Sequence, residues 1–404
     1  MNLNILFLTM SRIFDLEHRG IYPDLLRKFV EKGHRVSVVA PAERRFKEAT
    51  NFKNMGNYDV LRVKVGNLQK TNVIEKGIST VLLESQFLRA IKKYHKNNKF
   101  DLIIYSTPPI TFGKVIKYIK KRDNAKSYLL LKDIFPQNAV DIGMMSKTGV
   151  KGLIYRYFRK VEKGLYSISD YIGCMSQANV DYILKHNPEI DKTCVHISPN
   201  SVEVDEKIIM PQKKAEIREK YSIPSDKTVF IYGGNLGKPQ DISFVAECLK
   251  ANASADDRFF VICGTGTEYP KLKAFVDKEK PKNVLLINGL PKEEYEDFVS
   301  ACDVGLIFLD HRFTIPNFPS RILSYMQKRM PVLACTDKNT DMGKIIVNGG
   351  FGWWCESNDV SAFTKTVDEA VKASVSEMRE ASYNYLLGNY TTDKSYEAIM
   401  QNIN

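Results

Sequence analysis

Residues 228–238 read TVFIYGGNLGK, an apolar run that changes into a glycine-rich loop and ends on a lysine. The apolar run is typical of a buried strand, and a helical pattern follows the lysine. Such a loop lets backbone N–H groups approach an anion, and the lysine adds a full positive charge. The spacing matches neither a Walker A loop nor a dinucleotide G-x-G-x-x-G, and a turn that needs positive φ is the structural alternative. The strand-loop-helix context favours an anion site at Gly234, Asn235, Gly237 and Lys238.

The rest of the chain repeats this alternation of apolar runs and helical patterns. Further strand-like runs lie at 5–9, 34–41, 60–65, 101–106, 127–132, 171–176 and 193–198, and then at 259–264, 283–289, 304–309, 331–335 and 351–355. Apolar strands that alternate with helices predict parallel sheets covered on both faces. The rhythm breaks near residue 200. We therefore expect two Rossmann-like domains, 1–200 and 201–380, facing a ligand-binding cleft, and a helical tail, 381–404, that packs on the first domain.

Composition excludes several classes of protein. The 404 residues carry a net charge of +12, which favours anionic partners. No nucleic-acid-binding signature appears, and no apolar run reaches the roughly 18–20 residues of a spanning helix. The seven cysteines form no C-x-x-C pair, which is typical of a reduced, cytoplasmic protein. Without a D-x-D or H-E-x-x-H motif, we expect no metal.

Two further glycine-containing loops end strands of the second half. Gly264 and Gly266 follow one strand and would suit the wall of a nucleotide pocket, but a tight turn explains them equally well. Gly289 and Leu290 follow the next strand and could flank a nucleotide base, although a plain turn is favoured.

The segment 310–321, DHRFTIPNFPSR, links a strand to a helical pattern. Ser320 is the expected N-cap, and the N–H groups of the first helical turn form an anion site. Arg321 in that turn opposes the helix dipole, so it fits better as a partner of a ligand phosphate than as a solvated arginine. Together with Lys238 it would neutralise a diphosphate leaving group.

In the first half of the chain, two side chains could contact the hydroxyl group that accepts the transferred group. Asp133 ends a strand and could orient an acceptor hydroxyl or take its proton, with a helix-capping aspartate as the alternative. His18 lies in the loop after the first strand and could reach the same place.

Residues 151–166, KGLIYRYFRKVEKGLY, combine basic residues with an apolar stripe. The stripe comprises Ile154, Tyr157, Phe158, Val161 and Leu165. Such a helix could lie on an anionic membrane surface, but packing of the stripe on the sheet is favoured.

Taken together, these motifs resemble the GT-B, family 4 retaining glycosyltransferases, in particular those of bacterial O-antigen and capsule synthesis. The resemblance covers nearly the whole chain and rests on the loop around His18, on 33–36, on 133–136, on 234–238 and on 313–334. It implies a UDP-sugar donor held by the second domain and no further cofactor. It also implies an undecaprenyl-diphosphate-linked saccharide acceptor at the first domain, and a peripheral place on the cytoplasmic face of the inner membrane.

By the same resemblance, Lys238 and Arg321 would hold the diphosphate while Asp133 and His18 face the reacting groups. One departure concerns the E-x7-E pair of the family, whose positions correspond here to Pro316 and Ser324. Ser324 could still bind a ribose hydroxyl, and Asn317 could contact the donor sugar.

The P-N-F-P-S-R variant of residues 316–321 resembles a branch that handles N-acetylated 6-deoxy sugars such as N-acetylfucosamine. Two other functions stay open. A UDP-sugar 2-epimerase shares this architecture but needs more carboxylates and histidines, and a catalytically silent scaffold would explain the missing glutamates.

Overall fold

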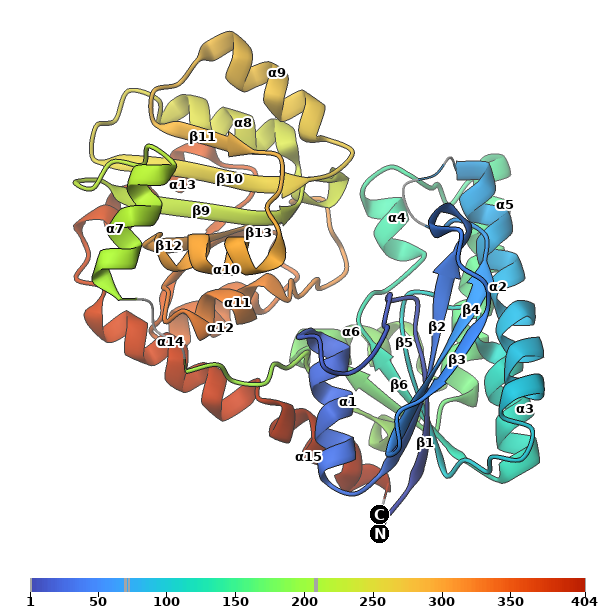
Figure 1. Cartoon of the computed structure of the whole chain (residues 1–404). Coiled ribbons are helices and arrows are strands. Elements are labelled where there is room, and N and C mark those ends of the chain that lie inside the picture. The colour runs from blue at the N-terminus through green and yellow to red at the C-terminus, as the bar shows by residue number, and fades with distance from the viewer. Residues whose placement is uncertain (1, 69–70, 72, 207–209, 404) are drawn as a thin grey trace. The chain divides into compact units, whose positions relative to one another are not determined.

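The computed structural model describes residues 2–68, 71, 73–206 and 210–403. The chain divides into two compact units (Figure 1). Unit 1 comprises Met1–Glu203 and Thr391–Asn404, and unit 2 comprises Val204–Tyr390. Each unit is built on one sheet with helices on both of its faces, which confirms the predicted α/β class. No helix among the described residues is both long and apolar enough to cross a membrane.

Unit 1 contains an eight-stranded sheet. Its strands are β1 (Asn4–Leu8), β2 (Arg35–Glu43), β3 (Asn51–Asn54), β4 (Tyr58–Val65), β5 (Leu102–Ser106), β6 (Lys126–Leu131), β7 (Tyr171–Cys174) and β8 (Val195–Ile197), and their order in the sheet is β3-β4-β2-β1-β5-β6-β7-β8. Its helices are α1 (Ile21–Glu31), α2 (Val73–Tyr94), α3 (Gly113–Asp123), α4 (Gln137–Asp141), α5 (Gly149–Ile168), α6 (Gln177–His186) and α15 (Thr392–Ile403).

Strand β1 of unit 1 shows why helices cover both faces of the sheet. Ile5 and Phe7 pack in a core with α1 and α15, whereas Leu6 and Leu8 point to the opposite face and are also fully buried. Only β3 departs from the predicted parallel arrangement, because it pairs antiparallel with β4 at the edge of the sheet. Its sequence NFKN carries no apolar run, so nothing in the sequence marked it as a strand.

Unit 2 contains a six-stranded parallel sheet. Its strands are β9 (Thr228–Asn235), β10 (Arg258–Thr265), β11 (Val284–Ile287), β12 (Val304–Phe308), β13 (Val332–Thr336) and β14 (Gly352–Glu356), in the order β11-β10-β9-β12-β13-β14. Its helices are α7 (Pro211–Lys220), α8 (Ile242–Ala251), α9 (Tyr269–Glu279), α10 (Lys292–Ser300), α11 (Arg321–Gln327), α12 (Met342–Asn348), α13 (Val360–Lys372) and α14 (Ser376–Asn389). The strand order reverses between β9 and β12, and a parallel sheet binds ligands at the carboxyl ends of its strands at such a point.

The end of the chain is shared between the units. Helix α14 packs on α11 and belongs to unit 2, whereas α15 packs on α1 and belongs to unit 1. Ile399, Met400 and Ile403 enter the core of unit 1, and the hydroxyl of Tyr396 lies 2.9 Å from His34 Nε2. The segment that joins unit 1 therefore starts at Thr391, about ten residues later than the predicted 381.

Candidate functional site

The glycine-rich loop of unit 2 lies where β9 ends, as predicted. Gly234 has φ of +123°, which side-chain-bearing residues rarely adopt, and Gly237 N donates to Gln240 Oε1 at 3.0 Å. Lys238 begins a 3-10 turn, Lys238–Gln240, and its side chain is exposed. Within the described part of the chain, Lys238 forms no ion pair, so its charge is available to a ligand.

Arg321, the first residue of α11, lies against this loop. A Cβ built on Gly234 would be only 2.6 Å from Arg321 Nη2, and the guanidinium carbon lies 3.9 Å from the ring centroid of Tyr232. The side chain is half-buried, and no carboxylate of the described residues pairs with it. Burial opposes its charge, but the three neighbouring tyrosines outweigh that effect and raise the pKa of Arg321 above its ordinary value. Arg321 is therefore a cation that no carboxylate of the described residues neutralises.

Three tyrosines build the wall behind this cation, and the sequence did not single them out. A Cβ on Gly233 would lie 1.7 Å from Tyr295 Oη. The Tyr325 hydroxyl donates to Ile231 O at 3.0 Å and Leu306 O at 3.1 Å, which ties β9 to β12. Tyr232 directly precedes the two glycines within β9, whereas Tyr295 comes from a helix distant in sequence, α10.

The segment between β12 and α11 departs from one prediction. Ser320 occupies the predicted N-cap position of α11, but with helical φ and ψ, and its side chain makes no capping hydrogen bond. Ser324 follows Arg321 by almost one helical turn and therefore lies on a similar side of α11. Asn317 is fixed through its backbone, because Thr340 Oγ1 donates to Asn317 O at 2.6 Å. The buried Asn317 Nδ2 has no hydrogen-bond acceptor within the described residues.

The glycines that end β10 have a structural explanation. A Cβ on Gly264 would lie 2.0 Å from Gly234 O, and one on Gly266 would lie 2.1 Å from Leu236 O. Gly289 has φ of +73°, which explains it as a turn residue beside the half-buried Leu290. The close backbone approach accounts for these glycines without a ligand, so Gly264 and Gly266 support the shape of the loop whether or not they touch a nucleotide.

Gly264→Ala should destabilise the protein strongly, because the atom that its Cβ meets is a backbone oxygen that cannot turn away. We expect the free energy of unfolding to fall by about 3 kcal/mol or more in a urea titration. Gly388→Ala is the matched control, since nothing lies within 4 Å of its Cβ and α14 gains helix propensity. That variant should gain up to about 1 kcal/mol. Equal stability of the two variants would contradict the packing described for β9 and β10.

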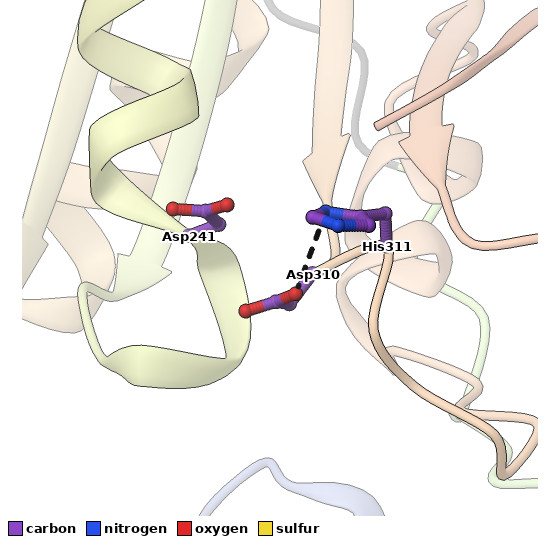
Figure 2. A group of neighbouring side chains, drawn as sticks. All are labelled: Asp241, Asp310 and His311. Carbon is purple, nitrogen blue, oxygen red and sulfur yellow. Dashed lines mark ion pairs between the residues drawn. The ribbon is translucent and has the colours of Figure 1, made fainter. Parts of the chain in front are cut away.

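Three potential metal ligands lie beside the glycine loop (Figure 2). Ligand atoms of Asp241, Asp310 and His311 all lie within 4.8 Å of one another. Arg312 Nε, however, donates to both Asp310 oxygens at 2.9 and 3.1 Å, and Asp241 Oδ1 accepts from Phe244 N at the start of α8. Burial would raise the pKa of Asp310, but the hydrogen bonds from Arg312 lower it. Arg312 thus already pairs with the buried carboxylate of this cluster.

In unit 1, Asp133 follows β6 at the carboxyl edge of the sheet. Asn138 Nδ2 donates to both of its carboxylate oxygens at 2.7 and 2.8 Å. The backbone N of Asp133 donates to Thr107 Oγ1 at 3.3 Å, which fixes the chain at this point. Burial raises the pKa of Asp133 to about 6, against the hydrogen bonds that favour its charge. Helix α4 starts at Gln137 with Pro136 at its N-cap position, so the alternative that Asp133 caps it is wrong.

His18 lies in the loop between β1 and α1, at the same edge of that sheet. Its Nδ1 is 2.6 Å from Asp15 Oδ1, and the ring is 79% exposed. Residues 11–15 and 18–23 line a cavity of about 430 Å³. The loop thus presents an imidazole with an anchored Nδ1 and a free face, next to a cavity that the sequence did not reveal.

The chain is similar to known glycosyltransferases in sequence and in fold. Residues 213–385, nearly all of unit 2, match the family model described as Glycosyl transferases group 1. The chain is 24% identical to the probable glycosyltransferase WbjE of Pseudomonas aeruginosa over 330 residues, which are 81% of this chain and 80% of WbjE.

Two solved structures have a similar fold. One is WaaG, a glycosyltransferase involved in lipopolysaccharide biosynthesis, with a TM-score of 0.66, 12% identity and 98% of each chain covered. The other is Anabaena HepE in complex with UDP and glucose, with a TM-score of 0.70, 12% identity and 99% of each chain covered. The two parallel-sheet units have the GT-B architecture of such structures, unit 2 matches the group 1 model, and the chain is a glycosyltransferase.

Proposed function

We propose that this protein transfers a sugar from a UDP-sugar to a lipid-diphosphate-linked saccharide, with retention of configuration and without a metal ion. The observation behind the proposal is Arg321, a half-buried cation that no carboxylate of the described residues neutralises and that lies on the glycine loop. A diphosphate placed at Gly234 would supply the missing anion. The family match of unit 2 and the UDP and glucose bound in HepE support a nucleotide sugar as its source.

The chemistry follows from the placement of charge. When the bond between the donor C1 and the diphosphate oxygen breaks, negative charge develops on that oxygen. Arg321 and Lys238 stabilise the charge from fixed positions, which lowers the barrier more than it strengthens ground-state binding. The acceptor hydroxyl then enters on the face that the leaving group vacates, and its proton passes to the departing phosphate or to Asp133.

For the donor sugar, we infer an N-acetylated 6-deoxyhexose such as N-acetylfucosamine. The inference rests on the P-N-F-P-S-R segment, in which Pro316 stands where the family usually has a carboxylate and the Asn317 amide follows it directly. Asn317 Nδ2 is a buried donor with no acceptor in the described part of the chain, and a sugar oxygen or carbonyl would satisfy it. Ser324 would contact the ribose.

For the acceptor, we infer an undecaprenyl-diphosphate-linked saccharide bound by unit 1, at the cytoplasmic face of the inner membrane. Asp133 with its raised pKa and His18 beside the cavity are the groups that would meet it. The product would serve O-antigen or capsule synthesis. The relation to WaaG, which is involved in lipopolysaccharide biosynthesis, supports this assignment.

A thermal-shift panel tests the proposed function. We expect UDP and UDP-sugars to raise the melting temperature, while GDP, ADP and TDP do not, because bound ligand stabilises only the folded state. EDTA should leave the shift unchanged. A shift that EDTA abolishes would contradict the metal-free mechanism. The absence of any shift with UDP would contradict the donor site and favour a silent scaffold.

A further inference from the structure

Helix α5 of unit 1 exposes large apolar side chains along its first half. The exposed fractions are 78% for Val150, 59% for Leu153, 47% for Ile154 and 54% for Tyr157, and Met144 just before the helix is 57% exposed. The four helical residues are spaced by three and four, so they lie on one side of α5. We call these five residues the apolar face. A contiguous exposed surface of this kind marks an interaction site.

The sequence favours packing of the whole apolar stripe of α5 on the sheet, but the structure buries only part of that stripe. Phe158 and Val161 are partly buried and Leu165 is buried, as predicted, but Ile154 and Tyr157 point to solvent. The prediction that the whole stripe packs on the sheet is therefore wrong for its first half. Helix α5 therefore has two apolar sides, one that packs on unit 1 and one that is exposed to solvent.

The surroundings of the apolar face are basic. Between residues 143 and 167 the basic residues are Lys147, Lys151, Arg156, Arg159, Lys160 and Lys163. The one acidic residue of that range, Glu162, is buried and accepts hydrogen bonds from Arg159 and Tyr166. Lys163 pairs with Glu189 at 2.9 Å. Lys147, Lys151, Arg156 and Lys160 form no ion pair within the described residues, so the helix presents uncompensated positive charge.

We propose that the apolar face of α5 docks on an anionic lipid bilayer. Its apolar side chains would enter the boundary between headgroups and acyl chains, and the lysines would meet anionic headgroups. This proposal rests on the proposed function, since a lipid-linked acceptor lies in that bilayer. A second copy of the chain fits less well, because a two-fold contact through α5 would bring Lys151 and Arg156 against their own like charges.

The inner side of α5 connects this surface to the proposed acceptor segment. The rings of Phe158 and Phe135 are in edge-to-face contact with centroids 5.1 Å apart, and Phe135 follows Asp133 by two residues. The Tyr155 hydroxyl lies 3.4 Å from Gln137 Oε1 at the start of α4. The helix that would touch lipid is thus the one that supports the loop of Asp133.

Vesicle cosedimentation of the full chain tests the proposal. We expect binding to vesicles of phosphatidylcholine and phosphatidylglycerol in equal parts, little binding to phosphatidylcholine alone, and weakening with salt. The double variant Leu153→Asp with Ile154→Asp should reduce partitioning at least about 30-fold, because it removes two inserted side chains. Lys151→Glu with Arg156→Glu should remove the preference for anionic vesicles. Leu387→Asp is the matched control, an exposed leucine on α14 of unit 2, and should bind as the unaltered chain does.

Two outcomes would overturn the proposal. One is no binding of the unaltered chain to anionic vesicles, and the other is unchanged binding of the Leu153 and Ile154 variant. A dimer in light scattering that this variant dissolves would assign the face to a second copy instead. The UDP-induced thermal shift separates the two proposals, because it should persist in every α5 variant. If the unaltered chain shows the UDP shift but does not bind anionic vesicles, docking alone is contradicted; if it binds vesicles but shows no UDP shift, the proposed donor is contradicted.

Discussion

Replacing Arg321 with alanine lowers kcat by about 100- to 1000-fold and changes the donor KM much less, because the charge that Arg321 answers is largest in the transition state. The measurement is the initial rate of sugar transfer at saturating donor. Arg321→Lys keeps the charge but loses the planar fork and the stacking on Tyr232, so it should recover only part of the rate.

Arg329→Ala is the control for this experiment. Arg329 follows the same helix, but its guanidinium pairs with Glu380 at 2.6 Å, and we expect its loss to leave kcat unchanged. Circular dichroism should show folded protein in all three variants. A rate near that of the unaltered protein for Arg321→Ala would remove Arg321 from the mechanism and leave Lys238 as the main cation at the leaving group.

Replacing Asp133 with asparagine lowers kcat by about 100-fold or more, if the carboxylate takes the acceptor proton. The pH profile gives the sharper test. Because burial raises the pKa of Asp133 to about 6, the carboxylate is protonated below that pH and cannot act as a base. We therefore expect the rate to fall as pH decreases through about 6, and Asp133→Asn to abolish this limb of the profile.

Asn138→Asp is a useful companion to Asp133→Asn. It removes the amide that donates to both carboxylate oxygens and places a second carboxylate beside the first, which raises the pKa of Asp133 further. The acidic limb should then move to higher pH. If the limb stays near pH 6 in both variants, another group titrates there and Asp133 has a structural role.

The sequence was sufficient for the strands and for the glycine loop, for a physical reason. Buried parallel strands are short apolar runs, so β9, β10 and β12 were visible as such, and a loop such as 233–238 follows directly from one of them. The edge strand β3 was not visible, because its four residues contribute little to any core. Its pairing with β4 is a property of the sheet and not of its own sequence.

The candidate site was predictable only as residue types at strand ends. Among the described residues, Lys238 and Arg321 have no carboxylate partner, whereas Arg312 pairs with Asp310. These pairings depend on contacts that no local pattern encodes. The same holds for Asn138 beneath Asp133 and for Tyr295 behind Gly233. The exposed half of α5 was missed because an apolar residue at helical spacing does not reveal which side of the helix the fold will cover.

The return of α15 to unit 1 bears on how the chain is made. During synthesis, residues 1–203 emerge first, but the core around Phe29 lacks Ile399, Met400 and Ile403 until the last helix has left the ribosome. Unit 2 is continuous in sequence, so its core needs no residue that follows Tyr390. The unit encoded first is therefore the one completed last. Until α15 is available, unit 1 exposes an apolar surface to which chaperones can bind.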